Sequence, residues 1–336
     1  MPKINPPAGG KKIIVVVGPT ASGKSDLGIK LARKFNGEII SADSRQVYKG
    51  MDIGTGKVTK KERSLVKHHL LDVANPKKVF TVSDFKKLGQ KAINDIQCRY
   101  KVPIIVGGTG FYIDVLLDRM AIAEVPPNKK LRAKLEKQST EQLFKRLQKL
   151  DPRRAKNIDS KNKRRIIRAL EIVLTIKKPV PKPLNLYHDR ILNANVLFLG
   201  LAVSPEIQKK KIKMRLDRRL KQGMIQEIKG LIKQGISKKR LYDLGLEYRW
   251  LSRWLSKNVK NKNVKNRAFD IRQSYNLKFK DSEEYQNLLR DIIKYSKRQM
   301  TWFKRNKDIH WINPPSARSG GDGQKKAEKL IQKFIS

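Results

Sequence analysis

The chain has 336 residues, of which 77 are lysine or arginine and 30 are aspartate or glutamate, so its formal net charge is +47 at pH 7. Hydrophobic residues still make up 39% of the chain, which is enough for a folded core and excludes general disorder. The single cysteine, Cys98, excludes an internal disulfide, and no apolar run approaches the roughly 20 residues of a membrane helix. We therefore expect a cytoplasmic protein without a membrane segment. The charge favours a polyanionic partner such as nucleic acid, although a lysine-rich host composition would also explain it.

The first part of the chain has the pattern of an α/β sheet. The β-branched run Ile13–Val17 predicts a strand that is buried on both faces, and apolar residues at helical spacing follow it after a glycine-rich segment. Two more short strands are expected over 38–42 and 103–106. Strands that alternate with helices favour a parallel sheet.

The glycine-rich segment fits the pattern G-x-x-x-x-G-K-[ST] between a predicted strand and a predicted helix. In such a loop the glycines let backbone N–H groups converge on phosphate oxygens, the lysine adds a positive charge, and the final hydroxyl can bind Mg²⁺. The sequence therefore predicts a phosphate-binding loop made of Gly18, Pro19, Thr20, Ala21, Ser22, Gly23, Lys24 and Ser25.

The acidic residue that accompanies this loop stands in an unusual place. A nucleoside-triphosphate hydrolase carries an aspartate after a later strand, but here the third predicted strand runs into Gly107, Gly108 and Thr109. Asp43 instead follows the second predicted strand, at the same edge of the sheet as the loop. It could hold a metal, orient a hydroxyl or act as a general base, or it could only cap a helix.

The pattern changes after residue 118. Residues 128–176 are almost wholly helical, Val196–Val203 is again a buried strand, and a basic helix begins near Pro205. We predict an α/β fold with a P-loop NTPase-like parallel sheet core and a helical insertion domain. Residues 1–118 form the first part of the core, 119–195 the insertion, 196–313 the second part of the core, and 314–336 a linker with a terminal helix.

Long segments of the chain, in order, resemble the tRNA dimethylallyltransferases, also called tRNA isopentenyltransferases. The likeness runs from about residue 12 to about residue 312, and the absence of a zinc-finger pattern suggests the bacterial type. The segments that carry it are Gly18–Ser25, Ile40–Lys57, His68–Asp72, Pro103–Tyr112, Arg164–Glu171 and Lys297–Phe303.

The resemblance implies transfer of a dimethylallyl group from dimethylallyl diphosphate to N6 of the adenosine 3′-adjacent to the anticodon. It implies that the loop binds the diphosphate, with Mg²⁺ as cofactor on Ser25. Asp43 would be the general base on the adenine amine, and Thr20 would lie beside the reacting centre. Lys24 and Arg215 would neutralise the leaving diphosphate, which completes the expected catalytic set.

The resemblance also implies a tRNA anticodon stem-loop as partner, bound by a monomer. For the basic helix near residue 165, a solvated surface is the alternative interpretation. The expected tRNA-binding residues are Asp43, Ser44, Arg45, Gln46, Thr109, Arg164, Arg165, Ile166, Ile167 and Arg168.

The chain departs from the family pattern in a few places. The usual Ile-Gly-Tyr-Lys-Glu segment reads Leu244-Gly245-Leu246-Glu247-Tyr248, which leaves the role of this segment in tRNA binding open. A methionine of the family is replaced by Arg219, and a leucine by Phe111. Lys24, Asp43 and Arg215 are not affected.

Three other functions compete with this interpretation. A prenyltransferase that acts on free adenine nucleotides would share the loop and Asp43, but the basic insertion favours tRNA. A small-molecule kinase would need a different pattern of acidic residues. A non-catalytic RNA-binding protein would have no use for an intact phosphate loop.

Overall fold

The structure is a computed structural model that describes residues 12–123, 125–180, 195–258, 275–314 and 322–336. It divides into two compact units, Met1–Leu117 with Tyr187–Ser336, and Asp118–Leu186. The first unit holds a six-stranded parallel sheet of order β3-β2-β4-β1-β5-β6, which confirms the predicted fold class. Its strands are β1 (Ile13–Val17), β2 (Gly37–Ala42), β3 (His68–His69), β4 (Val102–Gly107), β5 (Val196–Leu201) and β6 (Ile309–Ile312).

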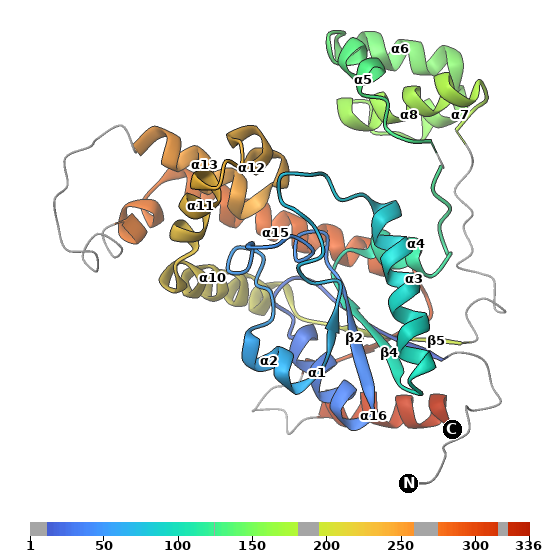
Figure 1. Cartoon of the computed structure of the whole chain (residues 1–336), viewed down its shortest axis with the longest axis vertical. Helices are drawn as coiled ribbons and strands as arrows, with labels where there is room; N and C mark the ends of the chain where they lie inside the picture. The colour runs from blue at the N-terminus through green and yellow to red at the C-terminus, as the bar shows by residue number, and fades with distance from the viewer. Residues whose placement is uncertain (1–11, 124, 181–194, 259–274, 315–321) are drawn as a thin grey trace. The chain divides into compact units, whose positions relative to one another are not determined.

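Helices cover both faces of this sheet (Figure 1). On one face, α1 (Lys24–Lys34) and α16 (Asp322–Ile335) pack against Ile14 and Val16 of the central strand. On the other face, α3 (Val82–Cys98) and α4 (Gly110–Leu116) pack against the alternate residues of that strand, Val15 and Val17. The central strand is therefore buried on both faces, as its continuous apolar run predicts.

The terminal helix α16 is part of this core. Its residues Ala327 and Ile331 are fully buried in the cluster that includes the sheet. The segment predicted as a linker with a terminal helix, 314–336, thus ends in a helix that completes one layer of the fold, while 315–321 lie outside the described residues.

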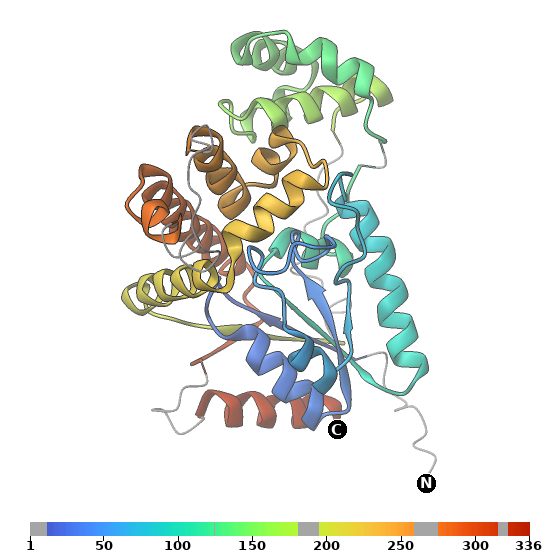
Figure 2. The same cartoon turned by 60° about the vertical axis from the view of Figure 1, so that its left-hand side comes forward.

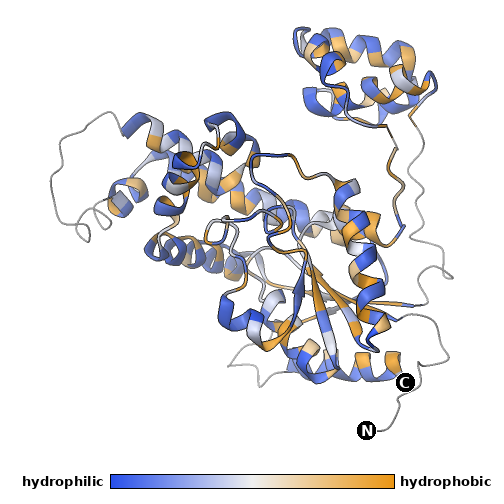
Figure 3. Cartoon of the chain, in the orientation of Figure 1, coloured by the Kyte–Doolittle hydropathy of each residue, from blue (hydrophilic) through white to orange (hydrophobic). Residues whose placement is uncertain are grey.

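A group of helices joins the sheet after β5 (Figure 2). These helices pack around a cluster that also contains Tyr48 and Met51, from the loop that follows β2. Most of α10 is hydrophilic (Figure 3). Three of its apolar residues, Ile212, Leu216 and Leu220, are buried in this cluster. The helices are α10 (Pro205–Gln222), α11 (Met224–Lys233), α12 (Lys238–Leu244), α13 (Leu246–Asn258) and α15 (Glu283–Phe303).

The second unit is helical and contains α5 (Lys129–Glu136), α6 (Thr140–Leu150), α7 (Pro152–Lys156) and α8 (Lys163–Ile176). At its centre the fully buried carboxylate of Glu171 accepts hydrogen bonds from both Arg132 and Arg168. The insertion predicted over 119–195 falls on this unit, and 181–194 lie outside the described residues.

Among the helices of the described residues, none is both long and apolar enough to cross a bilayer.

Candidate active site

The loop between β1 and α1 is shaped to receive an anion. No side chain caps the N-terminus of α1 at Gly23, so the N–H groups of the first helical turn remain available. The hydroxyl of Ser22 is buried and has no hydrogen-bond partner among the described residues. Lys24 Nζ donates to the carbonyl of Pro19 at 3.2 Å. A phosphate oxygen would supply the missing acceptor for both the hydroxyl and the helix terminus.

Two half-buried cations, Lys24 and Arg215, lie close together at this loop. Burial, followed by the charge of Arg215, lowers the pKa of Lys24 to about 8. Burial, followed by the charge of Arg219, lowers the pKa of Arg215 to about 9. Because desolvation and mutual repulsion both disfavour these charges, a bound anion would stabilise them.

The end of β4 shows why no carboxylate stands there. A Cβ atom at Gly108 would lie 2.1 Å from Nε2 of Gln299, which comes from α15. Gln299 Nε2 donates to the carbonyl of Gly108 at 2.8 Å, and its Oε1 accepts from the backbone N–H of Thr20 at 2.8 Å. The Gln299 side chain therefore fills the space that a side chain at Gly108 would need. It also connects the phosphate loop to α15 through its hydrogen bond with Thr20. The sequence patterns did not single out this residue, although it lies within the quoted segment Lys297–Phe303.

Asp43 lies at the carboxyl end of β2 and caps a turn. Its Oδ1 accepts from the backbone N–H groups of Arg45 at 2.8 Å and Gln46 at 3.4 Å. The residues that follow form a turn and not a helix. Asp43 therefore caps a turn, whereas the alternative interpretation expected it to cap a helix. These two bonds use only one carboxylate oxygen, which leaves Oδ2 to act on a ligand.

Asp43 also lines a cavity of about 390 Å³ in the first unit. Tyr295 of α15 lines the same cavity, and burial followed by the charge of Asp43 raises the pKa of its phenol to about 12. The Arg298 guanidinium lies 5.8 Å from the centre of the Tyr295 ring. The other lining residues include Thr20, Ser44, Arg45, Gly54, Thr55, Arg219, Arg249 and the altered segment at 244–248.

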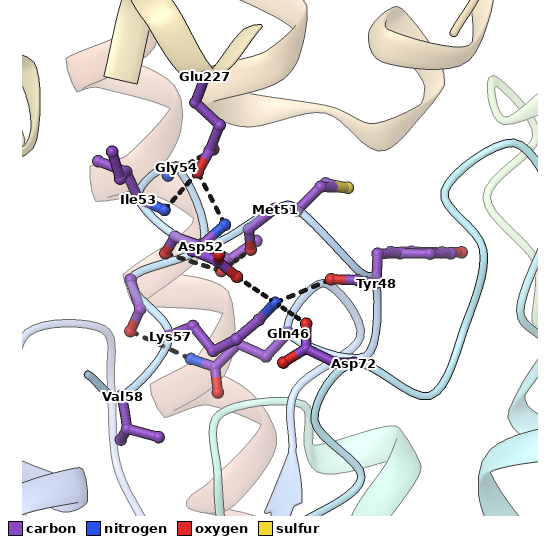
Figure 4. Close-up of polar contacts among 12 residues, drawn as sticks. Gln46, Tyr48, Met51, Asp52, Ile53, Gly54, Lys57, Val58, Asp72 and Glu227 are labelled. Carbon is purple, nitrogen blue, oxygen red and sulfur yellow. Dashed lines mark hydrogen bonds and ion pairs between the residues drawn. The ribbon is translucent and has the colours of Figure 1, made fainter. Parts of the chain in front are cut away.

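The loop from Met51 to Lys57 is anchored at one end by Glu227 of α11 (Figure 4). The Glu227 carboxylate accepts from the backbone N–H groups of Asp52, Ile53 and Gly54 at 2.8, 2.6 and 3.0 Å. It also accepts from the hydroxyl of Tyr248 at 2.8 Å. Three successive N–H groups that converge on one carboxylate fix the path of this segment.

Lys57 anchors the other end of the same loop (Figure 4). Its side chain is buried, and Nζ donates to the carbonyl of Tyr48 at 2.8 Å and to Asp52 and Asp72, each at 2.6 Å. No sequence pattern singles out Glu227 or Lys57 for this role, although Lys57 lies within the quoted segment Ile40–Lys57.

The carbonyls of this loop hold two arginines of α10. Gly54 O accepts from Arg219 Nη1 at 3.1 Å, and Gly56 O lies 3.5 Å from Arg215 Nη2. Gly56 has a φ of +61°, and a Cβ there would come within 2.3 Å of Arg215 Nη2. A side chain at this position would therefore displace the guanidinium groups.

The structure brings several of the predicted residues together. Thr20, Asp43, Ser44 and Arg45 line the cavity of about 390 Å³. Thr109 lies at the start of α4, where its hydroxyl accepts from the backbone N–H of Ser44 at 3.3 Å.

Gln46 differs from the expectation of tRNA contact. Its Oε1 accepts from the Ser41 hydroxyl at 3.0 Å, and its Nε2 donates to the carbonyl of Gly56 at 3.3 Å. Both ends of the amide thus bind the protein, so Gln46 positions the loop instead of lining the cavity.

The expected residues of α8 belong to the second unit and divide into two groups. The prediction that Ile166 and Ile167 bind tRNA is wrong, because both side chains are buried in the helical core. Arg168 donates to Glu171 at 2.6 Å and to the carbonyl of Val125 at 2.8 Å, so it is held inside the unit. Arg164 and Arg165 are exposed.

The parallel sheet, the loop between β1 and α1 and the carboxylate after β2 define a protein with a P-loop-like α/β fold. The family model described as IPP transferase matches residues 46–306. The chain belongs to the IPP transferase family, which is also what its resemblance to the tRNA isopentenyltransferases implied.

Individual relatives agree with this assignment. A tRNA dimethylallyltransferase of Carboxydothermus hydrogenoformans is 36% identical over 97% of both chains. One from Acetivibrio thermocellus is 35% identical over 90% of this chain and 91% of its own length.

Solved structures are similar as well. The tRNA isopentenylpyrophosphate transferase of Bacillus halodurans is 30% identical, with a TM-score of 0.65 over 97% of both chains. A eukaryotic dimethylallyltransferase solved acting on tRNA is 26% identical, with a TM-score of 0.74 over 96% of this chain and 78% of its own.

Proposed function

We propose that the protein transfers a dimethylallyl group from dimethylallyl diphosphate to N6 of the adenosine 3′-adjacent to the anticodon of tRNA, and releases diphosphate. The observation that carries the proposal is that Thr20 of the phosphate loop and the carboxylate Asp43 line one cavity. A prenyl donor bound by its diphosphate in the loop could therefore present its carbon to a base held beside Asp43. The membership of the IPP transferase family supports the same reaction.

The chemistry needs charge stabilisation at two points. The bond between the allylic carbon and the diphosphate oxygen breaks, so positive charge develops on the carbon and negative charge on the diphosphate. Lys24, Arg215 and the loop N–H groups stabilise the diphosphate. The N6 nitrogen forms the new bond to carbon, and its proton passes to the Asp43 carboxylate.

Mg²⁺ is the expected cofactor, and the residues present fit a weakly held ion. The described residues include no group of three or more His, Cys, Asp or Glu side chains that could hold a metal. Mg²⁺ commonly keeps several waters and binds through substrate phosphates. Ser25, in the first turn of α1, would supply a hydroxyl ligand, and the bound ion would neutralise part of the diphosphate charge.

The tRNA would reach the site as a flipped-out adenosine, since a base stacked in the anticodon loop cannot enter a cavity. Arg45 and Arg298 line that cavity, and Arg164 and Arg165 are exposed on the second unit, so these are the proposed RNA contacts. A single chain supplies both the phosphate loop and Asp43, which supports a monomer as the active form. The similarity to tRNA-modifying enzymes supports a cytoplasmic location.

The substitution Asp43→Asn tests the proposal, because it keeps the shape of the side chain and removes its basicity. We expect prenyl transfer to fall by about 10²- to 10⁴-fold, the usual worth of a general base. Binding of dimethylallyl diphosphate should persist. The assay measures label transferred from the prenyl donor to unmodified tRNA in Mg²⁺, and Asp95→Asn, at an exposed position of α3, is the control.

Parallel reactions with AMP and with ATP separate the alternatives. Label on AMP and not on tRNA would assign the protein to free adenine nucleotides. ATP turnover with no label on either acceptor would contradict the proposal and favour a kinase.

A further inference from the structure

Two arginines of α10 face the region of the phosphate loop. Arg215 and Arg219 are one helical turn apart, and their Nη2 atoms both lie against Gly56. Arg219 forms an ion pair with Glu247, with 3.0 Å between Nη1 and Oε1. Among the residues that the structure describes, no carboxylate forms an ion pair with Arg215. This corner of the site therefore carries an excess of positive charge.

Arg219 is well placed to meet a ligand that extends from the phosphate loop. It lines the cavity of about 390 Å³ together with Thr20 and Asp43. It also lines a small adjacent cavity with Thr20 and Arg215. Both of its hydrogen bonds to the part of the chain that is described use Nη1, so Nη2 keeps its donors. A planar guanidinium with free N–H groups is suited to phosphate oxygens.

Glu247, the ion-pair partner of Arg219, also affects how strongly this part of the site attracts anions. Its side chain is 10% exposed, and burial raises the pKa of its carboxyl. The charges of both Arg219 and Arg215 act on it. A carboxylate in this position holds Arg219 in place, and it also offsets part of the positive charge that an incoming anion would experience.

We propose that Arg219 is a second guanidinium for the diphosphate of the prenyl donor, beside Arg215, and that Glu247 positions Arg219 and restrains the affinity of the site for anions. This inference rests on the proposed function. A restrained affinity would ease release of the diphosphate product.

The test measures binding of inorganic pyrophosphate in Mg²⁺ by calorimetry, with the intact chain and without tRNA. Glu247→Gln removes the competing charge, so we expect the Kd for pyrophosphate to fall about three- to tenfold. In the double variant Arg219→Met with Glu247→Gln, both charges of the ion pair are removed, so neither is left without its partner. Its Kd should exceed that of the Glu247→Gln variant by about tenfold, because a charge-assisted hydrogen bond to the anion is removed.

Arg218→Met is the control, because it removes an equal charge from an exposed position of the same helix. Its Kd should stay within about twofold of the wild-type value, as expected for an exposed charge. A purely structural ion pair would instead lower the stability of both variants and leave their Kd values equal, and that result overturns the inference. Prenyl transfer by the wild-type protein is measured separately, so the proposed function can survive this outcome.

Discussion

At the scale of single residues, burial determines how the cations of the site behave. Lys24 and Arg215 are both half-buried, and the charge of Arg215 acts on Lys24 to lower its pKa further. Desolvation costs are tolerated at functional sites because a ligand of opposite charge offsets them. The orphaned hydroxyl of Ser22 points to the same ligand, since buried polar groups rarely lack a partner.

The lowered pKa of Lys24 predicts a pH limit on donor binding. The protonated amine binds the anion, so the affinity of the free protein for dimethylallyl diphosphate should fall as the pH rises through about 8. We expect kcat/KM for the donor to decrease above that pH, since this parameter reports groups of the free enzyme. In Lys24→Arg the guanidinium stays charged, so the decrease should shift upward by about one pH unit or more. Identical profiles for both proteins would show that Lys24 does not control binding.

At the scale of elements, the loop from Met51 to Lys57 connects α11 to the arginines of α10. Glu227 binds three of its N–H groups, and its carbonyls at Gly54 and Gly56 receive the guanidinium groups. Arg215 is thus oriented by backbone atoms whose own positions depend on another helix. Such support is what holds a functional side chain in a productive geometry.

Replacing Glu227 by Ala should loosen this loop. The three N–H groups and the hydroxyl of Tyr248 lose their acceptor. We therefore expect the free energy of unfolding to fall by about 1–3 kcal/mol. The loss is measured by urea denaturation. Pyrophosphate binding should weaken too, because the loop carbonyls no longer orient Arg215. Gln226→Ala, at an exposed neighbouring position, should change neither quantity. Unchanged pyrophosphate affinity in a destabilised Glu227→Ala protein would limit Glu227 to a structural role.

At the scale of the whole molecule, the net charge of +47 is the dominant property. A protein that neutralises phosphates releases counterions, so its affinity for RNA depends steeply on salt. The charge is spread over both compact units, whereas the phosphate loop lies in the first. We therefore expect salt to weaken tRNA binding far more than it weakens pyrophosphate binding.

Removing two exposed arginines of the second unit tests this expectation. In Arg164→Ala with Arg165→Ala, the slope of log K for tRNA against log salt should become less steep by about 0.7–0.9 for each phosphate that the variant no longer neutralises. The slope is measured by filter binding or fluorescence anisotropy across a salt series. Lys325→Ala with Lys326→Ala removes equal charge from exposed positions of α16. The slope of this control variant should stay steeper than that of the variant without Arg164 and Arg165. Equal slopes in the two variants would remove Arg164 and Arg165 from the RNA surface.

Prediction from the sequence succeeded where the signal is local. The strand Ile13–Val17 and the helix Pro205–Gln222 are where their apolar patterns place them. The edge strands β3 and β6 escaped prediction, because strands of two and four residues hold little periodicity. Ile166 and Ile167 were expected to bind tRNA only as part of a matched segment, and their burial is what apolar residues at helical spacing indicate.

The sequence by itself determined the class of the fold, the phosphate loop and the position of Asp43 after a strand, because each depends on short-range patterns and on the geometry of parallel sheets. Only the tertiary structure decided that Gln299 takes the place after β4, that Gln46 binds the protein and that Glu247 pairs with Arg219. These contacts join residues whose side chains meet through packing of separate elements, or they depend on which atoms of an amide face inward. The spacing of residues along the chain does not specify these contacts, because they depend on how helices and strands pack against one another.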